Sequence, residues 1–552
     1  MKFVSKILLI TISLAAFCAC SITAVKSSNS PTQFKKGDFI KVAKDNFTFV
    51  DSTGKRFLPM GGYYMNEHHK KADSYHWWDS FSEKWLDHDF AMAKQLGINT
   101  VRISFWLSVV SSNPANYVVG TPEDHKKIDT IVKTARKYGL RLYAEPRIEG
   151  KFIQNTAFFP LWILAFDTLS KKYKDEEAIF CWELDAEAVV LIGYKGDREN
   201  WDKWLENKYG SDKNIAKAWN VKTQKGWKNN IFNKYKSALH HSSEFDKLRN
   251  KKPEHWYLDS LNEEGSQALY DWQLFREHQY TEKMRILNNT IRANDTNHLV
   301  ALDLVLWFFP LVKNLGPAGW GGPYGYAAVD VQETSKFVDF IGVHTYPLYI
   351  PAFTIEWYEN LTKDEKIFDR QLRYLETMIR YIHANVEKPM PVVHSETGWH
   401  GGKDDYTGNS EEDQLRWSET LMEETKDCAV GWLNWLIKDI PSHEGLSGFI
   451  GMVGPGIKVT NDIHNLNPVG NYVYDGPLPK KDAYKLKALG KKFPELVKKY
   501  HNDPEVKYVK AKNQIKLSKK FLLTAGNKKL DKIMQEIINS TNFPVDIVIV
   551  TD

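Results

Sequence analysis

Two glutamates stand where short apolar segments give way to polar sequence. The segment 179–187 reads Ile-Phe-Cys-Trp-Glu-Leu-Asp-Ala-Glu and ends at Glu187, and the segment 391–396 reads Pro-Val-Val-His-Ser-Glu and ends at Glu396. A carboxylate at the end of a buried strand is costly unless it is paired or used in chemistry. Two carboxyl groups about 5–5.5 Å apart suit glycoside hydrolysis with retention, because one protonates the leaving oxygen while the other attacks the anomeric carbon. These glutamates are therefore the candidate catalytic pair.

The two glutamates can meet only in a fold that brings distant strand ends together. Short apolar runs alternate along the chain with amphipathic stretches of helical length. The predicted strands are 57–65, 99–106, 140–144, 178–184, 298–305, 338–343, 390–394 and 429–435. The predicted helices between them include 85–96, 124–138 and 411–425. Eight strands separated by helices predict an α/β fold, a (β/α)8 TIM barrel, in which chemistry sits at the C-terminal ends of the strands.

The barrel prediction also sets the domain boundaries. The catalytic barrel would span residues 40–500, with a long helical excursion after strand four at 201–292. A doubly wound sheet is the rival fold, but it usually has a Gly-rich phosphate turn after its first strand, which Gly61-Gly62 does not match. Residues 501–552 would form a basic C-terminal extension or a partial α/β module. Its predicted elements are a strand at 514–523, a helix at 530–538 and a strand at 545–550.

Five segments together resemble a known group of enzymes. They are 96–103 (Leu-Gly-Ile-Asn-Thr-Val-Arg-Ile), 182–187 (Trp-Glu-Leu-Asp-Ala-Glu), 340–346 (Phe-Ile-Gly-Val-His-Thr-Tyr), 394–399 (His-Ser-Glu-Thr-Gly-Trp) and 431–435 (Gly-Trp-Leu-Asn-Trp). In this order and spacing they resemble the clan of retaining glycoside hydrolases with (β/α)8 barrels. The nearest likenesses are the family 5 endo-glycanases, such as mannanases and cellulases, and the family 42 β-galactosidases. Segments 201–219 and 270–275 resemble the family 42 excursion after strand four.

The resemblance implies roles for individual residues. Glu396 would be the nucleophile of a double displacement and Glu187 the acid/base. Arg102 would support the nucleophile, and His344 and Tyr346 would hydrogen-bond the catalytic carboxylates or the substrate. The family 5 likeness implies β-mannan or β-glucan as substrate, and the family 42 likeness implies β-galactosides.

The two glutamates need different charge states for this chemistry. Glu396 has to stay ionised, which Arg102 and Tyr346 would favour. Glu187 has to carry a proton, and burial against Trp182 or Trp399, together with the nearby negative charge of Glu396, would raise its pKa. Once a covalent intermediate had formed, Glu187 would lose its proton more easily and activate water.

One residue departs from the family pattern. The pattern has Asn just before the strand-four Glu, where this chain has Ala186. That Asn holds the 2-hydroxyl of the sugar, a contact that strengthens in the transition state. Asp185 could supply a replacement contact. The departure also leaves a second function open, a catalytically silent carbohydrate-binding barrel.

Further carboxylates and indoles lie near the predicted strand ends. Glu145 ends the third strand and would be either a substrate-binding carboxylate or an ion-pair partner. Glu183 alternates in phase with Glu187, so that both could face the barrel interior, where Glu183 would be salt-bridged. Trp399 and Trp435 offer flat apolar faces with a polar N–H, which suit stacking against a sugar.

Composition narrows the classes of partner. The net charge of +5 arises in the tail, because lysines outnumber acidic residues beyond residue 480, and the body has no nucleic-acid footprint. His344 and His394 lie near strand ends without a matching ligand set, so the sequence predicts neither a metal nor a cofactor. The predicted partner is an oligo- or polysaccharide, with no nucleic acid and no integral membrane partner.

The N-terminus has the order of an export signal. Lys2 and Lys6 are followed by an apolar stretch from Ile7 to Cys18 and then by small residues, which predicts a signal peptide over 1–24. The apolar stretch is short for a membrane span. The sequence around Cys20 resembles a bacterial lipobox. We therefore expect a secreted or extracytoplasmic protein, with attachment to the envelope through a lipid on Cys20 as the alternative.

Overall fold

Eight parallel strands close into a barrel at the centre of the chain. The computed structural model describes residues 34–65, 78, 81–113, 116–151, 153–187, 192, 194–221, 225–237, 265–305, 308–311, 327–346, 365–399, 410–439, 451–455 and 484–550. The barrel strands are β4 (Met60–Tyr63), β5 (Thr100–Leu107), β8 (Arg141–Ile148), β9 (Ile179–Glu183), β10 (Leu299–Leu304), β11 (Phe340–Thr345), β12 (Val392–Thr397) and β13 (Trp432–Asn434). They are hydrogen-bonded in chain order, and β13 pairs with β4 to close the ring. The predicted (β/α)8 barrel is confirmed.

The barrel strands are buried on both faces, as expected for parallel strands under crossover helices. Their N-terminal end is closed by a small antiparallel sheet of β1 (Lys41–Val42), β2 (Phe49–Val50) and β3 (Arg56–Phe57). Phe49 of this sheet packs edge-on against Phe180 and Phe340, with ring centroids 5.2 and 5.3 Å away. An aromatic layer therefore seals one end of the barrel and leaves the other end for polar groups.

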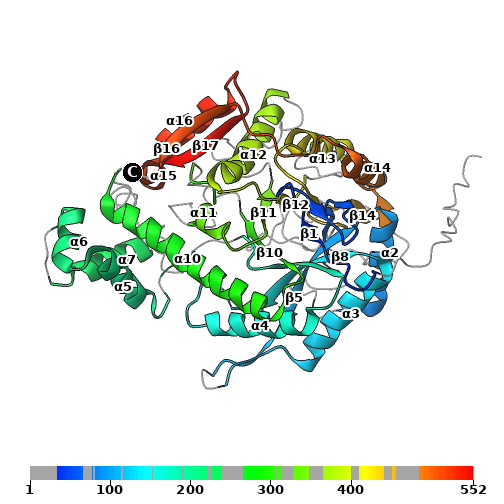
Figure 1. The fold of residues 1–552 in the computed structure, drawn as a ribbon, viewed down its shortest axis with the longest axis horizontal. Helices are drawn as coiled ribbons and strands as arrows, with labels where there is room; N and C mark the ends of the chain where they lie inside the picture. Colours follow the sequence, from blue (N-terminus) through cyan, green and yellow to red (C-terminus); the bar gives the residue numbers. More distant parts are fainter. Residues whose placement is uncertain are drawn as a thin grey trace, which may run out of the picture.

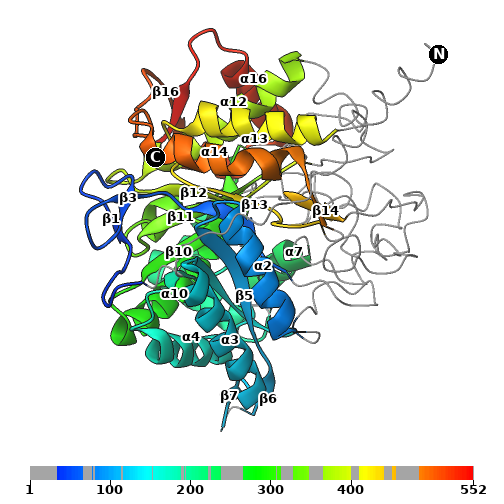
Figure 2. The ribbon, with the colours of Figure 1, turned by 90° about the vertical axis from the view of Figure 1, so that its right-hand side faces the viewer.

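The helices around the barrel begin and end at residues suited to those positions. They are α2 (Glu83–Gln95), α3 (Pro122–Tyr138), α4 (Phe159–Tyr173), α11 (Val331–Thr334), α12 (Glu365–Asn385), α13 (Glu411–Thr425) and α14 (Ala488–Asn502). Thr121 and Asp124 form a capping box before α3, and Gly139 ends it in the left-handed conformation. Figure 2 shows α12, α13 and α14 side by side on one flank of the barrel and α2 and α3 on another. Among the described residues, every helix is too short or too polar to cross a bilayer.

The excursion after β9 is helical where it is described. It contains α5 (Asp197–Tyr209), α6 (Asp212–Trp219), α7 (Trp227–Ser237) and the long α10 (Gln267–Asn294), which returns the chain to the barrel. Figure 1 shows the first three helices gathered at one end of α10. Trp201 anchors this group, with Trp219 stacked at 5.9 Å and Trp272 and Phe275 packed at 5.4 and 4.9 Å. The excursion therefore has an aromatic core of its own, built on α10.

The C-terminal segment packs against the barrel helices. Its parallel strands β16 (Asn513–Ser518) and β17 (Val545–Val550) flank α15 (Lys519–Thr524) and α16 (Asn527–Ile538). The predicted strand 514–523 is wrong in its second half, because the Ser518 side chain accepts from the Phe521 N–H and starts a helix. Figure 1 shows β17 and α16 beside α12. Lys519 contacts Glu277 of α10 at 2.8 Å, which ties the segment to the excursion.

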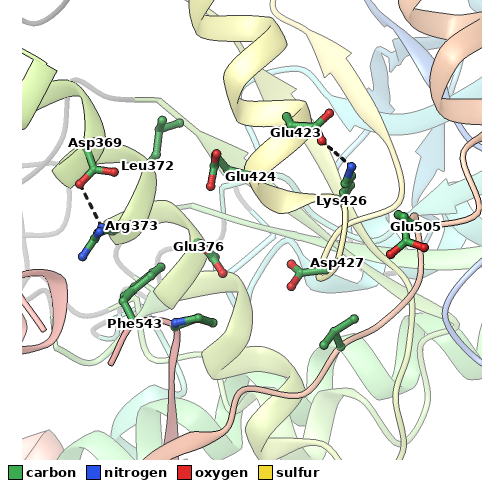
Figure 3. Close-up of a pocket in the computed structure, with 12 residues that line it drawn as sticks. Asp369, Leu372, Arg373, Glu376, Glu423, Glu424, Lys426, Asp427, Glu505 and Phe543 are labelled. Carbon is green, nitrogen blue, oxygen red and sulfur yellow. Dashed lines mark hydrogen bonds and ion pairs between the residues drawn. The ribbon is translucent and has the colours of Figure 1, made fainter. Parts of the chain in front are cut away.

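A cavity of about 460 Å³ lies where α12 and α13 meet the C-terminal segment, and we call it the C-terminal cavity. Its lining residues are Asp369, Leu372, Arg373, Glu376, Glu423, Glu424, Lys426, Asp427, Glu505, Val509, Phe543 and Pro544. Figure 3 shows acidic side chains reaching this space from both helices. Acidic residues outnumber basic ones in the lining by six to two.

Two short antiparallel pairs of strands complete the described structure. The pair β6 (Val109–Ser111) and β7 (Val118–Val119) extends from the end of β5, and β14 (Val453–Pro455) pairs with β15 (Tyr484–Leu486) before α14. The predicted export segment 1–24, including Cys20, lies outside the described residues.

Candidate active site

Arg102 is the central cation inside the barrel. It projects from β5 and is fully buried. Its Nε and Nη2 donate to the two oxygens of Glu183 at 2.8 and 2.6 Å, and its Nη1 donates to Glu396. Two further carboxylates, Glu145 and Asp303, lie 3.5 Å away. Burial lowers the pKa of Arg102, but these carboxylates outweigh it, so the pKa lies well above its ordinary value.

The barrel brings the two predicted catalytic glutamates together. Glu187 follows β9 and Glu396 lies on β12, and His344 of β11 stands between them. The ring nitrogen Nδ1 of His344 lies 3.0 Å from Oε1 of Glu187 and 3.2 Å from Oε2 of Glu396. One ligand atom from each of these three residues lies within 4.8 Å of the others. The carboxyl groups therefore sit at a separation at which one reacting atom can contact both.

Glu396 is held from two sides. The Tyr346 hydroxyl donates to its Oε2 at 2.9 Å, and Arg102 donates to its other oxygen. Glu396 is buried, with 7% of its surface exposed to solvent. Burial and the charge of Glu187 raise its pKa above the ordinary value, against the opposing charges of His344 and Arg102. Both residues predicted to support Glu396 therefore contact it.

Glu187 has a different environment from the one the sequence predicted. Its side chain is 48% exposed, and its backbone φ of 53° is uncommon for a residue other than glycine. Burial of its inner part raises its pKa, but the hydrogen bond and charge of His344 outweigh this, so the pKa lies below the ordinary value. The predicted raised pKa is wrong for this state of the site. Trp182 cannot raise it, because it lies on the other face of β9 and donates to Asp295 at 2.8 Å.

His344 lies between these carboxylates, and their charges favour its protonated form. Burial lowers its pKa, but Glu396, Asp303 and Glu187 together raise it to about 10. A protonated imidazole donates from both nitrogens and offers no lone pair to a metal ion. The three possible ligand residues Glu187, His344 and Glu396 therefore do not suit a metal while His344 is charged.

Two other predicted carboxylates occupy separate positions. Glu145 is an ion-pair partner: it contacts Arg147 and Arg102 and accepts from the Ser104 hydroxyl at 2.5 Å. It is 1% exposed, so it offers no surface to a substrate in this structure. The predicted interior salt bridge of Glu183 is confirmed by its two hydrogen bonds from Arg102.

Asp185 sits near the catalytic pair and is held by the excursion. The Tyr280 hydroxyl of α10 donates to its Oδ2 at 2.9 Å, and the Gln154 amide lies 3.4 Å from the same oxygen. Burial raises the pKa of Asp185 to about 7, against the charge of Arg147 and the bond from Tyr280. Asp185 can therefore donate or accept a hydrogen bond near neutral pH.

The two predicted stacking tryptophans differ in exposure. Trp399 is 1% exposed, so its indole packs in the core and presents no face to a sugar in this structure. Trp435 is partly exposed and packs against the ring of Tyr63, with centroids 4.6 Å apart. Of the two, Trp435 alone offers surface for stacking.

Sequence reasoning missed three residues of the site. Asp303 on β10 faces both Arg102 and His344, Arg147 faces Glu145, and Tyr280 reaches Asp185 from the excursion. Asp303 could have been found from the sequence, because it is the one acidic residue of the predicted strand 298–305. Tyr280 could not have been found, because its partner lies 95 positions earlier in the chain.

Several solved structures of known proteins have a similar fold. No family model and no curated sequence matches the chain. Among solved structures, the exo-β-1,4-mannosidase Op5Man5 from Opitutaceae bacterium strain TAV5 has a TM-score of 0.53 at 14% identity, covering 92% of this chain and 72% of its own. A β-galactosidase from the psychrophilic Marinomonas ef1 has a TM-score of 0.55 at 13% identity, covering 89% and 70%. GH5_18 from Streptomyces cattleya, solved in complex with GlcNAc, has a TM-score of 0.51 at 9% identity, covering 90% and 94%.

These likenesses define a class of fold. The chain has the (β/α)8 barrel of glycoside hydrolases, as its sequence motifs predicted. At these identities the likeness concerns the fold, and function has to be argued from the site.

Proposed function

We propose that the chain is a retaining β-glycosidase in which Glu396 is the nucleophile and Glu187 the acid/base. The observation that carries the proposal is the placement of the two carboxylates around His344, with atoms of all three within 4.8 Å. Retaining enzymes need this short separation because the nucleophile itself attacks the sugar, whereas inverting enzymes leave room for a water molecule.

The reaction would proceed in two displacements. In the first, an oxygen of Glu396 forms a bond to the anomeric carbon while the glycosidic C–O bond breaks, and Glu187 gives its proton to the leaving oxygen. In the second, Glu187 takes a proton from water, which attacks the anomeric carbon and releases Glu396. Arg102 and Tyr346 would orient Glu396 and accommodate its change of charge through their hydrogen bonds.

Substrate binding would favour the protonated form that Glu187 needs, with the proton taken from solvent. Nearly half of its side chain is exposed before a sugar is bound. A sugar that covered this surface would remove water from the carboxylate, and the loss of solvation favours the protonated form. The low pKa of Glu187 in the free site therefore rises when the site is occupied.

Three candidate substrate classes follow from the fold neighbours and the sequence motifs. The neighbours named as a mannosidase and a β-galactosidase support β-mannosides and β-galactosides, and the family 5 motifs add β-glucans. Trp435 would stack on the sugar, and Asp185 would hydrogen-bond it in place of the asparagine that Ala186 replaces. The export signal at 1–24 would deliver the enzyme outside the cytoplasm, where such glycans occur.

A silent sugar-binding barrel is the second candidate, favoured by Ala186. This residue is 9% exposed and its methyl group cannot hydrogen-bond a substrate. Both candidates bind sugars, so binding alone does not separate them.

The test combines turnover with covalent trapping. The chain is screened against mannan, mixed-linkage glucan and aryl β-mannosides, β-galactosides and β-glucosides, and the anomer first released is identified by NMR. We expect hydrolysis with retention, loss of several orders of magnitude in Glu187→Gln and Glu396→Gln, and a 2-deoxy-2-fluoro glycoside attached at Glu396. Glu424→Gln in the C-terminal cavity is the matched control and should keep its rate. Sugar binding without turnover would favour the silent barrel, and normal rates in either catalytic variant would refute the assignment.

A further inference from the structure

Asp303 lies under the catalytic pair and does not contact it directly. It is the fifth residue of β10 and is fully buried. Its Oδ1 accepts a hydrogen bond from the Tyr143 hydroxyl. Its Oδ2 points toward two cations, at 3.5 Å from Nε of Arg102 and 3.7 Å from Nε2 of His344. The carboxylate therefore faces the side of the imidazole that is turned away from Glu187 and Glu396.

The facing atoms of Asp303 and His344 are suited to each other. Oδ2 of Asp303 and Nε2 of His344 are both buried, and neither makes a hydrogen bond within the described residues. Burying a polar atom without a hydrogen-bond partner costs about 1–3 kcal/mol. A small movement that closed the 3.7 Å gap between these two atoms would therefore remove this cost for both. The opposite nitrogen, Nδ1, is already engaged by Glu187 and Glu396.

The neighbouring strand leaves room for this carboxylate. Asp303 is paired in register with Gly342 of β11. A Cβ atom at position 342 would lie 2.0 Å from Oδ1 of Asp303 and 2.4 Å from its Cγ, closer than atoms can approach. The same Cβ would lie 2.6 Å from Oγ of Ser395. The space occupied by the Asp303 carboxylate thus exists because residue 342 has no side chain.

We propose that Asp303 is a positioning residue, which fixes the imidazole of His344 and keeps it doubly protonated so that one N–H faces both Glu187 and Glu396. The residue would act on catalysis through His344. This inference rests on the proposed function for its role in hydrolysis, but the state of His344 can be measured without a substrate.

The charges around His344 give the expected direction of the effect. It is faced by Glu187 from the end of β9, Asp303 from β10 and Glu396 from β12, while the cation Arg102 of β5 lies beyond two of them. Neutralising Asp303 removes one of three anions that favour the charged imidazole. A carboxylate at this range shifts a pKa by about 1–3 units, so the pKa of His344 falls from about 10. When His344 loses its charge, the pKa values of Glu187 and Glu396 rise.

The experiment follows His344 by NMR in the full chain labelled with 15N-histidine, with the signal assigned by its loss in His344→Gln. We expect both ring nitrogens of the unsubstituted protein to be protonated at pH 8. In Asp303→Asn the titration midpoint of the His344 ring should fall by at least about one pH unit. Glu145→Gln is the matched control, because Glu145 is equally buried and equally far from Arg102 but faces Arg147, and it should leave the midpoint of His344 in place.

Two results would overturn the proposal. One is a neutral His344 at pH 8 in the unsubstituted protein, a measurement that needs no variant to fold. The other is an unchanged His344 midpoint in folded Asp303→Asn. If the chain hydrolyses glycosides, kcat/KM of Asp303→Asn should change at the lowered titration midpoint of His344, because the charge that faces Glu187 and Glu396 is lost there. If it does not, the NMR result still decides the positioning role while the proposed function alone fails.

Discussion

The barrel interior and the C-terminal cavity both gather carboxylates, but the cations that face them are arranged differently. Inside the barrel, Arg102 and His344 are almost fully buried and each contacts several carboxylates. At the C-terminal cavity one buried cation, Arg380, pairs with Glu376, whereas other ion pairs involve exposed groups, such as Asp369 with its side chain 59% exposed. Water screens such contacts, whereas buried ones keep their strength. The two regions therefore differ in how many of their ion pairs are buried.

The pKa values of the acidic residues also differ between the two regions. In the C-terminal cavity, burial and the neighbouring acids Asp427 and Glu424 raise the pKa of Glu376 to about 7, in spite of Arg380. There burial, together with repulsion between the acids, outweighs the attraction of Arg380. At the barrel mouth the cation His344 lowers the pKa of Glu187 even though Glu396 is close.

The largest difference between the regions should appear when a cation is removed. Arg102→Met leaves the carboxylates of Glu183 and Glu396 without their partner, and breaking a buried ion pair costs about 3–5 kcal/mol of folding free energy. Hydrolysis should be lost as well. In the C-terminal cavity Lys426→Met breaks an exposed pair with Glu423 and should cost less than ~1 kcal/mol. Urea unfolding followed by tryptophan fluorescence measures the free energy of unfolding of both variants. Equal losses in the two variants would contradict the proposed difference between the regions.

The acid/base role of Glu187 gives the second prediction. Glu187→Gln should reduce kcat about 10²–10⁴-fold on alkyl glycosides, whose leaving groups need a proton. The loss should be much smaller on 2,4-dinitrophenyl glycosides, which leave as stable anions. Glu424→Gln in the C-terminal cavity should change neither rate. A loss that does not depend on the leaving group would argue against Glu187 as the acid.

The pH dependence of stability gives the third prediction. The pKa of Glu376 is raised to about 7, so the folded chain binds more protons than the unfolded chain between about pH 4.5 and 7. Unfolding free energy therefore falls as the pH rises through this window, by at most ~3 kcal/mol from this group. Glu376→Gln should flatten that part of the curve, as measured by denaturant titrations at several pH values. An unchanged slope would contradict the raised pKa.

The smallest predicted effect concerns the link from the excursion to the site. Tyr280→Phe removes the hydrogen bond to Asp185, worth about 1 kcal/mol, and raises the pKa of Asp185 above about 7. We expect a loss of up to about tenfold in kcat/KM, mostly through KM. Tyr374→Phe on α12 is the control, since that hydroxyl is buried, makes no hydrogen bond to the described part of the chain and lies outside the site. Equal effects of the two changes would mean that the excursion does not act through Asp185.

The barrel was predictable because each of its strands is a short apolar run with a helical stretch after it. The contacts of Glu396 with Arg102 and Tyr346 followed from motifs at three strand ends. The low pKa of Glu187 could not be predicted, because it depends on the His344 ring nitrogen lying 3.0 Å from the Glu187 carboxylate. The sequence does not give this distance. The helix after Ser518 was missed because its side-chain cap competes with an apolar pattern that suits a strand equally well.

Gly342 limits which substitutions this barrel can tolerate. Any side chain at position 342 would begin with a Cβ atom 2.0 Å from Oδ1 of Asp303, so the two positions cannot be varied independently. In a mutational library of the barrel, larger residues at position 342 should be recovered mainly together with a smaller residue at position 303.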